Sequence, residues 1–550
     1  MDKFYVKKES NTFSDGIEAL GLASIINNIF DQVSPDDKPD ILIEDKGFCY
    51  QISLSSPIED EMIDKCRYFD ILPYIANKND DVKKISHSFI DYENEKKIRD
   101  NYNDPTTQQK KDIPYPVRPD YDIIRMFANM EGYKKSFHNC REFENHFPEF
   151  LKFLLKFYSL IDEDLTKYEK ELKEFLNENE IKPSKINALQ DINPDKGKGV
   201  NQPKANGINP KGQNDFWLQQ LVRFKGAWSS FVSRYFDKDI KTYSLVPRKI
   251  SFDVLNSVFK RFKPLVKGKD SIKMDILLIQ LLTKELIKHD VNFKNNGFFI
   301  SPKDKISGFQ MAYYKNLGQR PAVTNIGFLG LPDFIKFRSE AEGLDWIDLL
   351  EEHQDVISAI KSNSSNISML QKYRQFISAS DFESFFEFCY EYGQFLISSI
   401  SDKKYFIKPF SIKKLEVLMK TKYDYQEILS NSGFQAVASA IRNSTIVPII
   451  HKNKKDVVFG LSQKFKIASR DKDSLASEVS EFINQYNESV MLKDYHQKQH
   501  HKYVTTEELR EFFKLLDGDN SSKLIAGMLI AFGYAKDPSK EIENQEVQND

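Results

Sequence analysis

The order of apolar and polar residues predicts a mixed fold for the first third of the chain. Residues 17–30 have the spacing of a short apolar helix, and residues 40–54 have the alternation of a β-hairpin around a Glu-Asp-Lys-Gly turn at 44–47. Apolar residues recur at helical spacing again over 147–177. Residues 91–120 are polar and contain four prolines, so we expect them to be extended or loop-like. We therefore predict an N-terminal α/β domain at 1–181.

The segment 182–215 is a Gly/Asn/Lys-rich loop or linker with almost no apolar content between residues 193 and 214. Loops this long inside compact proteins are uncommon, and they are usually functional or disordered. One interpretation is a flexible linker. The other is a loop that contacts nucleic acid, because Asn, Gln and Lys reach base edges and phosphates. The candidate contacts in it are Lys198, Asn201, Asn206, Asn209, Lys211 and Gln213.

The remaining pattern changes from mixed to helical. Residues 216–410 are predicted to form a central mixed domain, with strands at 242–250 and 323–329, helices around them, and Gly318 as a helix C-cap. The pattern is helical over 346–400, and residues 411–536 predict a helical bundle in which Thr505 and Glu508 form a capping box. Residues 537–550 read as a disordered acidic tail. The predicted fold class is α+β, with mixed α/β N-terminal and central regions followed by an all-α bundle.

Composition narrows the class of protein. The chain has 550 residues with 43 Phe and 25 Tyr, enough to bury several cores. Its four cysteines are scattered, which argues for a reducing compartment and against a cysteine zinc site. The first ten residues are charged and no run of about 18 apolar residues occurs, so we expect a soluble cytoplasmic protein with no membrane partner.

Charge is unevenly distributed, although the net charge is only −2. Residues 211–269 contain thirteen lysines and arginines against four acidic residues. Within them, Trp217, Leu221, Phe224 and Trp228 have the spacing of a buried helical stripe, so the basic residues are the expected contacts with phosphate. The candidates here are Arg223, Lys225, Arg248 and Lys249.

Two further segments are candidates for binding nucleic acid. Lys315 and Arg320 lie in the segment 303–338, where a purely structural role is equally open. Residues 440–472 have eight basic residues against two acidic ones, and a solvated helix face is the alternative interpretation. The candidates in this last segment are Arg442, Lys452, Lys454, Lys455, Lys464 and Lys466.

Motifs for catalysis are missing from the sequence. It contains no Walker A, HExxH or GxSxG pattern, and Asp517 opens a turn rather than a calcium loop, because Ser522 and Met528 replace the required Gly and Glu. His496 and His500 are four residues apart without a third strong ligand. We therefore expect no catalytic residue, metal or cofactor. One alternative is a divergent metal-dependent nuclease that uses His289 and Asp290, and another is a protein scaffold without nucleic-acid contact.

Several short motifs resemble one family, the large subunit of the type I CRISPR surveillance complex called Cascade, of subtype B or A. They cover residues 214–536 well and the rest weakly. The motifs are Asn-Asp-Phe-Trp at 214–217 with Gly226 and Trp228, Lys-Thr-Tyr-Ser-Leu-Val-Pro at 241–247, Gly-Phe-Gln-Met-Ala-Tyr-Tyr-Lys-Asn-Leu-Gly at 308–318, Val-Thr-Asn-Ile-Gly-Phe-Leu-Gly-Leu-Pro at 323–332, Gly-Phe-Gln-Ala-Val-Ala-Ser-Ala-Ile-Arg-Asn-Ser-Thr at 433–445, Phe-Gly-Leu at 459–461, Phe-Ile-Asn-Gln-Tyr-Asn at 482–487 and Leu-Ile-Ala-Phe-Gly-Tyr-Ala at 529–535.

The resemblance implies a DNA-binding and RNA-binding role in antiviral defence without catalysis. Such a subunit recognises the protospacer-adjacent motif in target duplex DNA, aids R-loop formation, holds the displaced strand and helps to recruit a helicase-nuclease. The implied partners are the guide RNA, the target double-stranded DNA, the Cascade backbone and guide-end-capping subunits, and small helical subunits. In subtype B relatives the small subunit is translated separately from the matching region, so Met419 is a candidate internal start; the alternative is an ordinary apolar residue.

Overall fold

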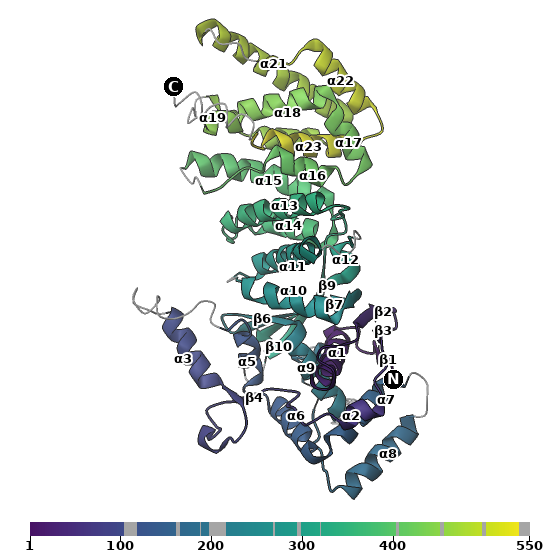
Figure 1. The fold of residues 1–550 in the computed structure, drawn as a ribbon. Coiled ribbons are helices and arrows are strands. Elements are labelled where there is room, and N and C mark those ends of the chain that lie inside the picture. Colours follow the sequence, from purple (N-terminus) through teal and green to yellow (C-terminus); the bar gives the residue numbers. More distant parts are fainter. Residues whose placement is uncertain are drawn as a thin grey trace, which may run out of the picture. The chain divides into compact units, whose positions relative to one another are not determined.

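The computed structural model describes residues 1–103, 118–160, 165–187, 189–196, 216–267, 270–293, 299–318, 321–402, 406–450, 456–497 and 502–537. It confirms the α+β class, with sheets in the N-terminal and central parts and helices toward the C-terminus (Figure 1). The chain forms two compact units. Unit 1 contains residues 1–271 and 303–331, and unit 2 contains residues 272–302 and 332–550. These divisions all lie inside the central domain expected at 216–410.

The first sheet of unit 1 has the order β1-β3-β2-β8, and every neighbouring pair is antiparallel. Its strands are β1 (Lys3–Lys7), β2 (Ile41–Asp45), β3 (Cys49–Leu54) and β8 (Lys249–Ser251). The hairpin predicted at 40–54 is confirmed, with Ile43 opposite Ile52. The helix predicted at 17–30 is also confirmed, as part of α1 (Phe13–Val33), whose apolar residues pack against this sheet.

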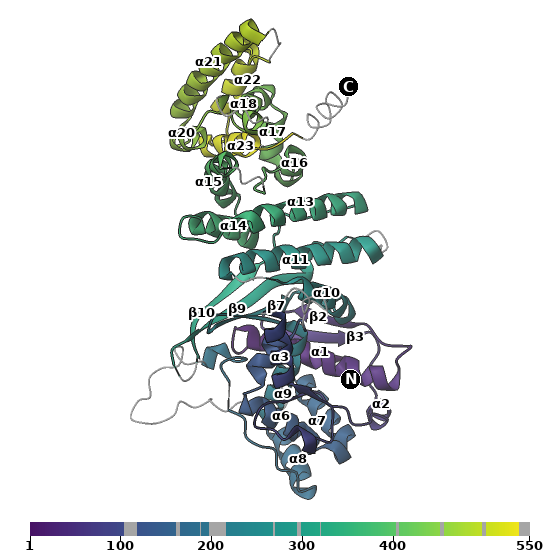
Figure 2. The same cartoon turned by 90° about the vertical axis from the view of Figure 1, so that its left-hand side faces the viewer.

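The second sheet has the order β10-β9-β7-β6, again antiparallel throughout (Figure 2). Its strands are β6 (Phe231–Phe236), β7 (Asp239–Pro247), β9 (Ile306–Asn316) and β10 (Pro321–Gly330). The strand predicted at 323–329 is confirmed. The single strand predicted at 242–250 is wrong in its end, because β7 stops at Pro247 and the next residues form β8 of the first sheet. The helix expected to end at Gly318 is wrong, because this glycine lies between two paired strands with φ 122°. A positive φ suits a helix C-cap and a strand connection equally, so the glycine alone could not distinguish them.

Helices α1 and α9 (Trp217–Ser230) cross in unit 1 at two glycines. A Cβ atom added to Gly226 would lie 1.6 Å from the carbonyl oxygen of Ile17, and one added to Gly21 would lie 1.9 Å from that of Val222. The two backbones are therefore in direct contact. The predicted stripe of α9 is confirmed in part, because Leu221 and Phe224 are fully buried while both tryptophans are half-buried.

The other elements of unit 1 surround these sheets. They are α2 (Asp60–Asp64), β4 (Tyr74–Ala76), β5 (Phe89–Asp91), α3 (Tyr92–Asn103), α5 (Tyr121–Phe127), α6 (Glu131–Arg141), α7 (Phe147–Ser159), α8 (Leu165–Glu178) and α10 (Phe252–Leu265). Helices α7 and α8 confirm the helical pattern predicted over 147–177. The extended segment expected at 91–120 is wrong for α3, whose residues include no proline; the prolines of this segment all follow it.

Unit 2 consists of helices in its described parts. They are α11 (Ser271–Phe293), α13 (Glu340–Ala359), α14 (Ile367–Ala379), α15 (Phe382–Ser401), α16 (Ile412–Met419), α17 (Tyr423–Ser430), α18 (Ser432–Ser444), α19 (Ile446–Ile450), α20 (Leu461–Ala468), α21 (Lys472–Gln497), α22 (Thr506–Asp517) and α23 (Ser522–Gly533). The short helix α12 (Pro302–Lys305) begins with the last residue of a unit 2 segment, and its other residues belong to unit 1. The helices predicted over 346–400 and 411–535, the capping box and the turn after Asp517 are confirmed. No described helix is long and apolar enough to cross a membrane.

Helix α15 packs on the C-terminal helices, although it precedes the bundle expected at 411–536. The Phe386 ring lies against Gly527 of α23, and Gly393 lies against the Tyr534 ring. Met419 is fully buried at the end of α16. A product that starts at Met419 would lack both α15 and most of α16. The internal start stays a prediction, and such a product would need another partner to cover α23.

Candidate nucleic-acid interface

The structure describes eight of the residues predicted to contact nucleic acid. Arg223, Lys225, Arg248, Lys249 and Lys315 belong to unit 1, and Arg442, Lys464 and Lys466 belong to unit 2. Of these, Lys315 is exposed near the end of β9. The predicted contacts that lie outside the described residues are Lys198, Asn201, Asn206, Asn209, Lys211, Gln213, Arg320, Lys452, Lys454 and Lys455.

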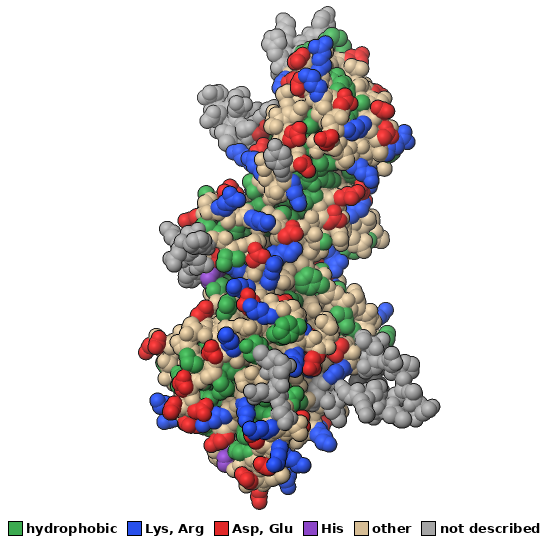
Figure 3. Space-filling view, turned by 90° about the vertical axis from the view of Figure 1, so that its right-hand side faces the viewer, with side chains coloured by type: hydrophobic (Ala, Val, Ile, Leu, Met, Phe, Trp, Pro, Cys, Tyr) green, Lys and Arg blue, Asp and Glu red, His purple; other side chains and the backbone are tan. Residues whose placement is uncertain are grey.

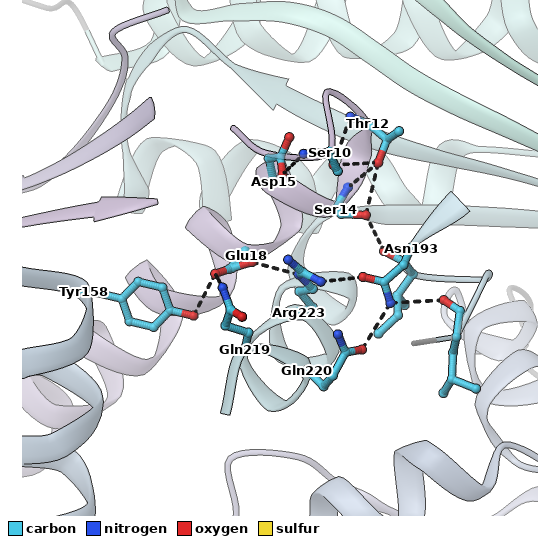
Figure 4. A network of polar contacts seen from close by, with 12 residues as sticks. Ser10, Thr12, Ser14, Asp15, Glu18, Tyr158, Asn193, Gln219, Gln220 and Arg223 are labelled. Carbon is cyan, nitrogen blue, oxygen red and sulfur yellow. Dashed lines mark hydrogen bonds and ion pairs between the residues drawn. The ribbon is translucent and has the colours of Figure 1, made fainter. Parts of the chain in front are cut away.

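Arg223 is buried in a polar network, which corrects its prediction as a surface contact (Figure 4). Its Nε atom donates to Glu18 Oε2 at 2.8 Å, and its Nη1 atom donates to Asn193 Oδ1. The Tyr158 hydroxyl donates to Glu18 Oε1 at 3.0 Å, and the Asn193 amide donates to Gln220 Oε1 at 3.1 Å. The network connects α1, α7, α9 and the segment at Asn193, and Arg223 lies at its centre.

Lys225, on the same helix, is half-buried, and burial lowers the pKa of its ammonium group to about 8. In unit 2, Arg442 is half-buried and its Nη2 atom donates to the Phe532 carbonyl at 3.0 Å, joining α18 to α23. Burial also lowers the pKa of Arg442. Arg442 therefore links two helices of unit 2. Both cations are only partly accessible, whereas a contact with phosphate requires an exposed cation.

The described part of the C-terminal basic run is also paired internally. Lys466 of α20 lies 2.6 Å from Glu387 of α15 and above the Tyr390 ring. Lys464 is exposed, and its Nζ atom lies 3.8 Å from Glu478. Of the described candidates in residues 440–472, Arg442 and Lys466 are therefore paired within unit 2. Lys464 is the one with an exposed side chain.

Arg248 and Lys249 meet the turn of the β2–β3 hairpin in unit 1. The Asp45 amide donates to the Arg248 carbonyl at 2.7 Å, and Lys249 pairs with Glu44 across the β2–β8 ladder. Both side chains are more than half exposed. We call the cluster at this turn the basic hairpin; it consists of Lys7, Lys8, Lys46, Phe48, Arg248 and Lys249.

The Phe48 ring is 72% exposed at the tip of the basic hairpin. Its neighbourhood is fixed: Gly47 adopts φ 88°, its amide donates to Asp45 Oδ1 at 2.8 Å, and the Lys8 amide donates to the Phe48 carbonyl at 3.0 Å. A single exposed ring is common on proteins. A ring held on a short turn among five cations is different, because it can stack on a base while the cations contact phosphates.

Three carboxylates pair with the cations of the basic hairpin. Lys8 lies 2.6 Å from Asp45, Lys46 and Lys249 lie 2.6 and 3.6 Å from Glu44, and Arg248 lies 3.0 Å from Asp304. Lys8 and Asp45 are only 17% and 21% exposed, so this pair belongs to the packing of the turn. The pairs of Lys46, Arg248 and Lys249 are more exposed and contribute little to stability, so these three cations can exchange a carboxylate for a phosphate at low cost. Basic and acidic side chains are interspersed over the face shown in Figure 3.

The alternation predicted over 40–54 gives Phe48 the same spacing as Tyr50 and Ile52, which suggests one shared buried face. Tyr50 and Ile52 are indeed buried, whereas Phe48 precedes the first residue of β3 and lies beyond the sheet. The signal that could have shown this was the position of Phe48 directly after the turn glycine.

His289 and Asp290, the residues of the nuclease alternative, are both buried on α11. The His289 Nδ1 atom lies 3.7 Å from Asp290 Oδ1. Among the described residues, no group of three or more His, Cys, Asp or Glu side chains is arranged to hold a metal ion. His500 and the side chain of His496 lie outside the described part of the chain.

Comparison with known proteins adds no family to these observations: no family model matches this chain, and no curated protein matches it.

Proposed function

We propose that this chain binds nucleic acid as the non-catalytic large subunit of a type I CRISPR RNA-guided surveillance complex in the cytoplasm. The observation that carries the proposal is the basic hairpin, which presents an exposed ring among five cations on a fixed turn. The ring and the cations suit contact with duplex DNA, where an apolar wedge enters a base step while cations neutralise phosphates. The motifs quoted from the sequence supply the resemblance to the family.

In this role, guide RNA and one DNA strand pair to read sequence, and the large subunit contacts the short duplex motif beside the target. We assign that contact to the basic hairpin. The further tasks implied by the resemblance are R-loop formation, holding the displaced strand and helping to recruit the helicase-nuclease. The partners would be the guide RNA, the target duplex, the backbone and guide-end-capping subunits, and small helical subunits.

The double substitution Arg248→Glu/Lys249→Glu should weaken binding to a fluorescein-labelled DNA duplex by about tenfold or more. Losing two phosphate contacts should also reduce the slope of log affinity against log salt by about 1.8. Phe48→Ala should weaken binding with an unchanged slope, because a ring contact releases no counterions. Fluorescence anisotropy of the full chain over a range of salt concentrations measures both effects.

The matched control is Lys182→Glu/Lys185→Glu, which makes the same charge change at two exposed positions of unit 1, in a segment that Ser184 bonds to Asn139 of α6. Equal losses in both double variants would contradict a local site at the basic hairpin. Absence of any shift with DNA or RNA would favour the scaffold alternative. Cleavage of the duplex by the purified protein with a divalent metal ion would favour the nuclease alternative.

A further inference from the structure

A cleft of about 590 Å³ lies in unit 1 beside α10, within the size range of ligand sites. The end of α9 lines it with Trp228, and the residues before α5 line it with Arg118 and Asp120. Helix α10 contributes Asn256, Lys260 and Lys263. These six side chains comprise an aromatic ring, an amide, three cations and one carboxylate.

The carboxylate of Asp120 is already satisfied by Arg118. The Arg118 Nε atom donates to Asp120 Oδ1 at 2.9 Å, and Nη2 donates to Oδ2 at 3.0 Å. Burial raises the pKa of Asp120. The bonds from Arg118 and the charges of Arg118 and Lys263 outweigh burial and hold this pKa below its usual range. Arg118 also lies 3.6 Å from Glu95, so its charge is shared between two carboxylates, and the two lysines are the cations that remain in the lining of the cleft.

Lys263 and Lys260 are the cations that an anion would meet. The Lys263 Nζ atom lies 3.4 Å from the Trp228 carbonyl oxygen. Burial lowers the pKa of Lys263 to about 8, the charge of Asp120 raises it, and the charges of Arg234 and Arg118 lower it further. Lys260 is exposed at the rim of the cleft and makes no ion pair with the described residues. A phosphate between the two lysines would replace solvation that Lys263 has lost.

The Trp228 ring is held in a fixed position. Its Nε1 atom donates to the Tyr133 hydroxyl at 3.2 Å, and the ring packs edge-on against Phe127 with 6.0 Å between centroids. The ring is half-buried, so part of its surface faces the cleft. Aromatic rings beside a basic groove bind single-stranded nucleic acid by stacking without reading sequence.

We propose that this cleft binds one phosphodiester of single-stranded nucleic acid between Lys260 and Lys263, with the adjoining base against Trp228. The inference rests on the proposed function and deepens it. It assigns to unit 1 a site for an unpaired strand, separate from the contact of the basic hairpin with duplex DNA.

The test is fluorescence anisotropy of the full chain with a labelled oligodeoxycytidine of about 20 nucleotides, enough to span a single-strand site. Lys260→Glu and Lys263→Met should each weaken binding by about tenfold, whereas Lys185→Glu, an exposed charge reversal elsewhere in unit 1, should change it less than about twofold. Lys260→Glu alters an exposed side chain, so it keeps the test valid if Lys263→Met folds poorly.

A pH series separates the cleft from general electrostatic attraction. Wild-type affinity should fall by about tenfold between pH 7 and pH 9 as Lys263 loses its proton, and Lys263→Met should abolish this fall. Competition with inorganic phosphate and with cytidine monophosphate, at constant ionic strength, shows whether phosphate alone or phosphate with a base is bound.

Wild-type affinity in both lysine variants would overturn the cleft site while leaving the proposed function standing. An equal loss in Lys185→Glu would also overturn it, because the effect would then be one of total charge. Failure of the wild-type chain to bind single strands, duplex DNA or RNA would overturn both proposals.

Discussion

Gly226→Ala should destabilise unit 1 by about 3 kcal/mol or more, the largest effect that we expect from a single methyl group in this chain. The added Cβ atom would lie 1.6 Å from the carbonyl oxygen of Ile17, which is backbone and cannot rotate away. Helices α1 and α9 would have to separate, and the packing of both would loosen. Urea unfolding followed by tryptophan fluorescence measures the loss, because Trp217 and Trp228 both lie on α9.

The matched control is Gly16→Ala on α1, where the nearest atom to the added Cβ is the Leu245 carbonyl oxygen at 3.4 Å. Alanine has a higher helix propensity than glycine by about 1 kcal/mol, so this variant should be neutral or slightly stabilised. If Gly226→Ala unfolds at the same urea concentration as Gly16→Ala, the backbone contact between the two helices is not as close as described.

Arg223→Met should destabilise unit 1 by about 3–5 kcal/mol, because it leaves the buried Glu18 carboxylate without its cation. The hydrogen bond from Arg223 to Asn193 would be lost as well. The double variant Glu18→Gln/Arg223→Met should recover much of the loss, since a neutral amide oxygen can still accept from Tyr158. Urea unfolding of the two single variants and the double variant measures this coupling.

This prediction also decides between the two roles considered for Arg223. A structural role predicts that the folded fraction of Arg223→Met binds DNA with the wild-type salt slope. A stable Arg223→Met protein with weaker binding and a reduced salt slope would show instead that Arg223 contacts phosphate.

Local patterns predicted the elements whose signals lie within a few residues. The β2–β3 hairpin followed from alternation around a glycine turn, and the start of α22 followed from the Thr505–Glu508 capping box. Helix α3 was missed because its residues are polar, and the apolar spacing that marks an amphipathic helix is weak there. Strand β9 was read as a helix although it forms a local hairpin with β10 around Gly318. Only its other partner, β7, lies far earlier in the chain, where local patterns do not reveal the pairing.

Ion pairs between distant residues engage two of the predicted cations. Arg223 and Glu18 are 205 positions apart, and Lys466 and Glu387 are 79 apart, so neither pairing was visible in the sequence. Arg248 and Lys249 are exposed, so their contact with nucleic acid stays a prediction, and the structure adds the exposed Phe48 ring on the same turn.

The glycines in the quoted motifs have a structural reason. Gly226 permits the contact between α1 and α9, and a Cβ atom added to Gly433 would lie 2.2 Å from the Glu508 carbonyl oxygen, where α18 meets α22. The glycines at these two positions are therefore explained by close packing of helices. The chemistry that we propose lies instead in the basic hairpin and the cleft beside α10.

Affinity purification of the chain from the cells that encode it, followed by sequencing of the bound RNA, tests the central claim most directly. We predict that it purifies with guide RNA and with backbone subunits, and that the purified assembly binds a duplex matching the guide without cutting it. A chain that purifies without RNA, or that cleaves the duplex by itself with a divalent metal ion, would contradict the account.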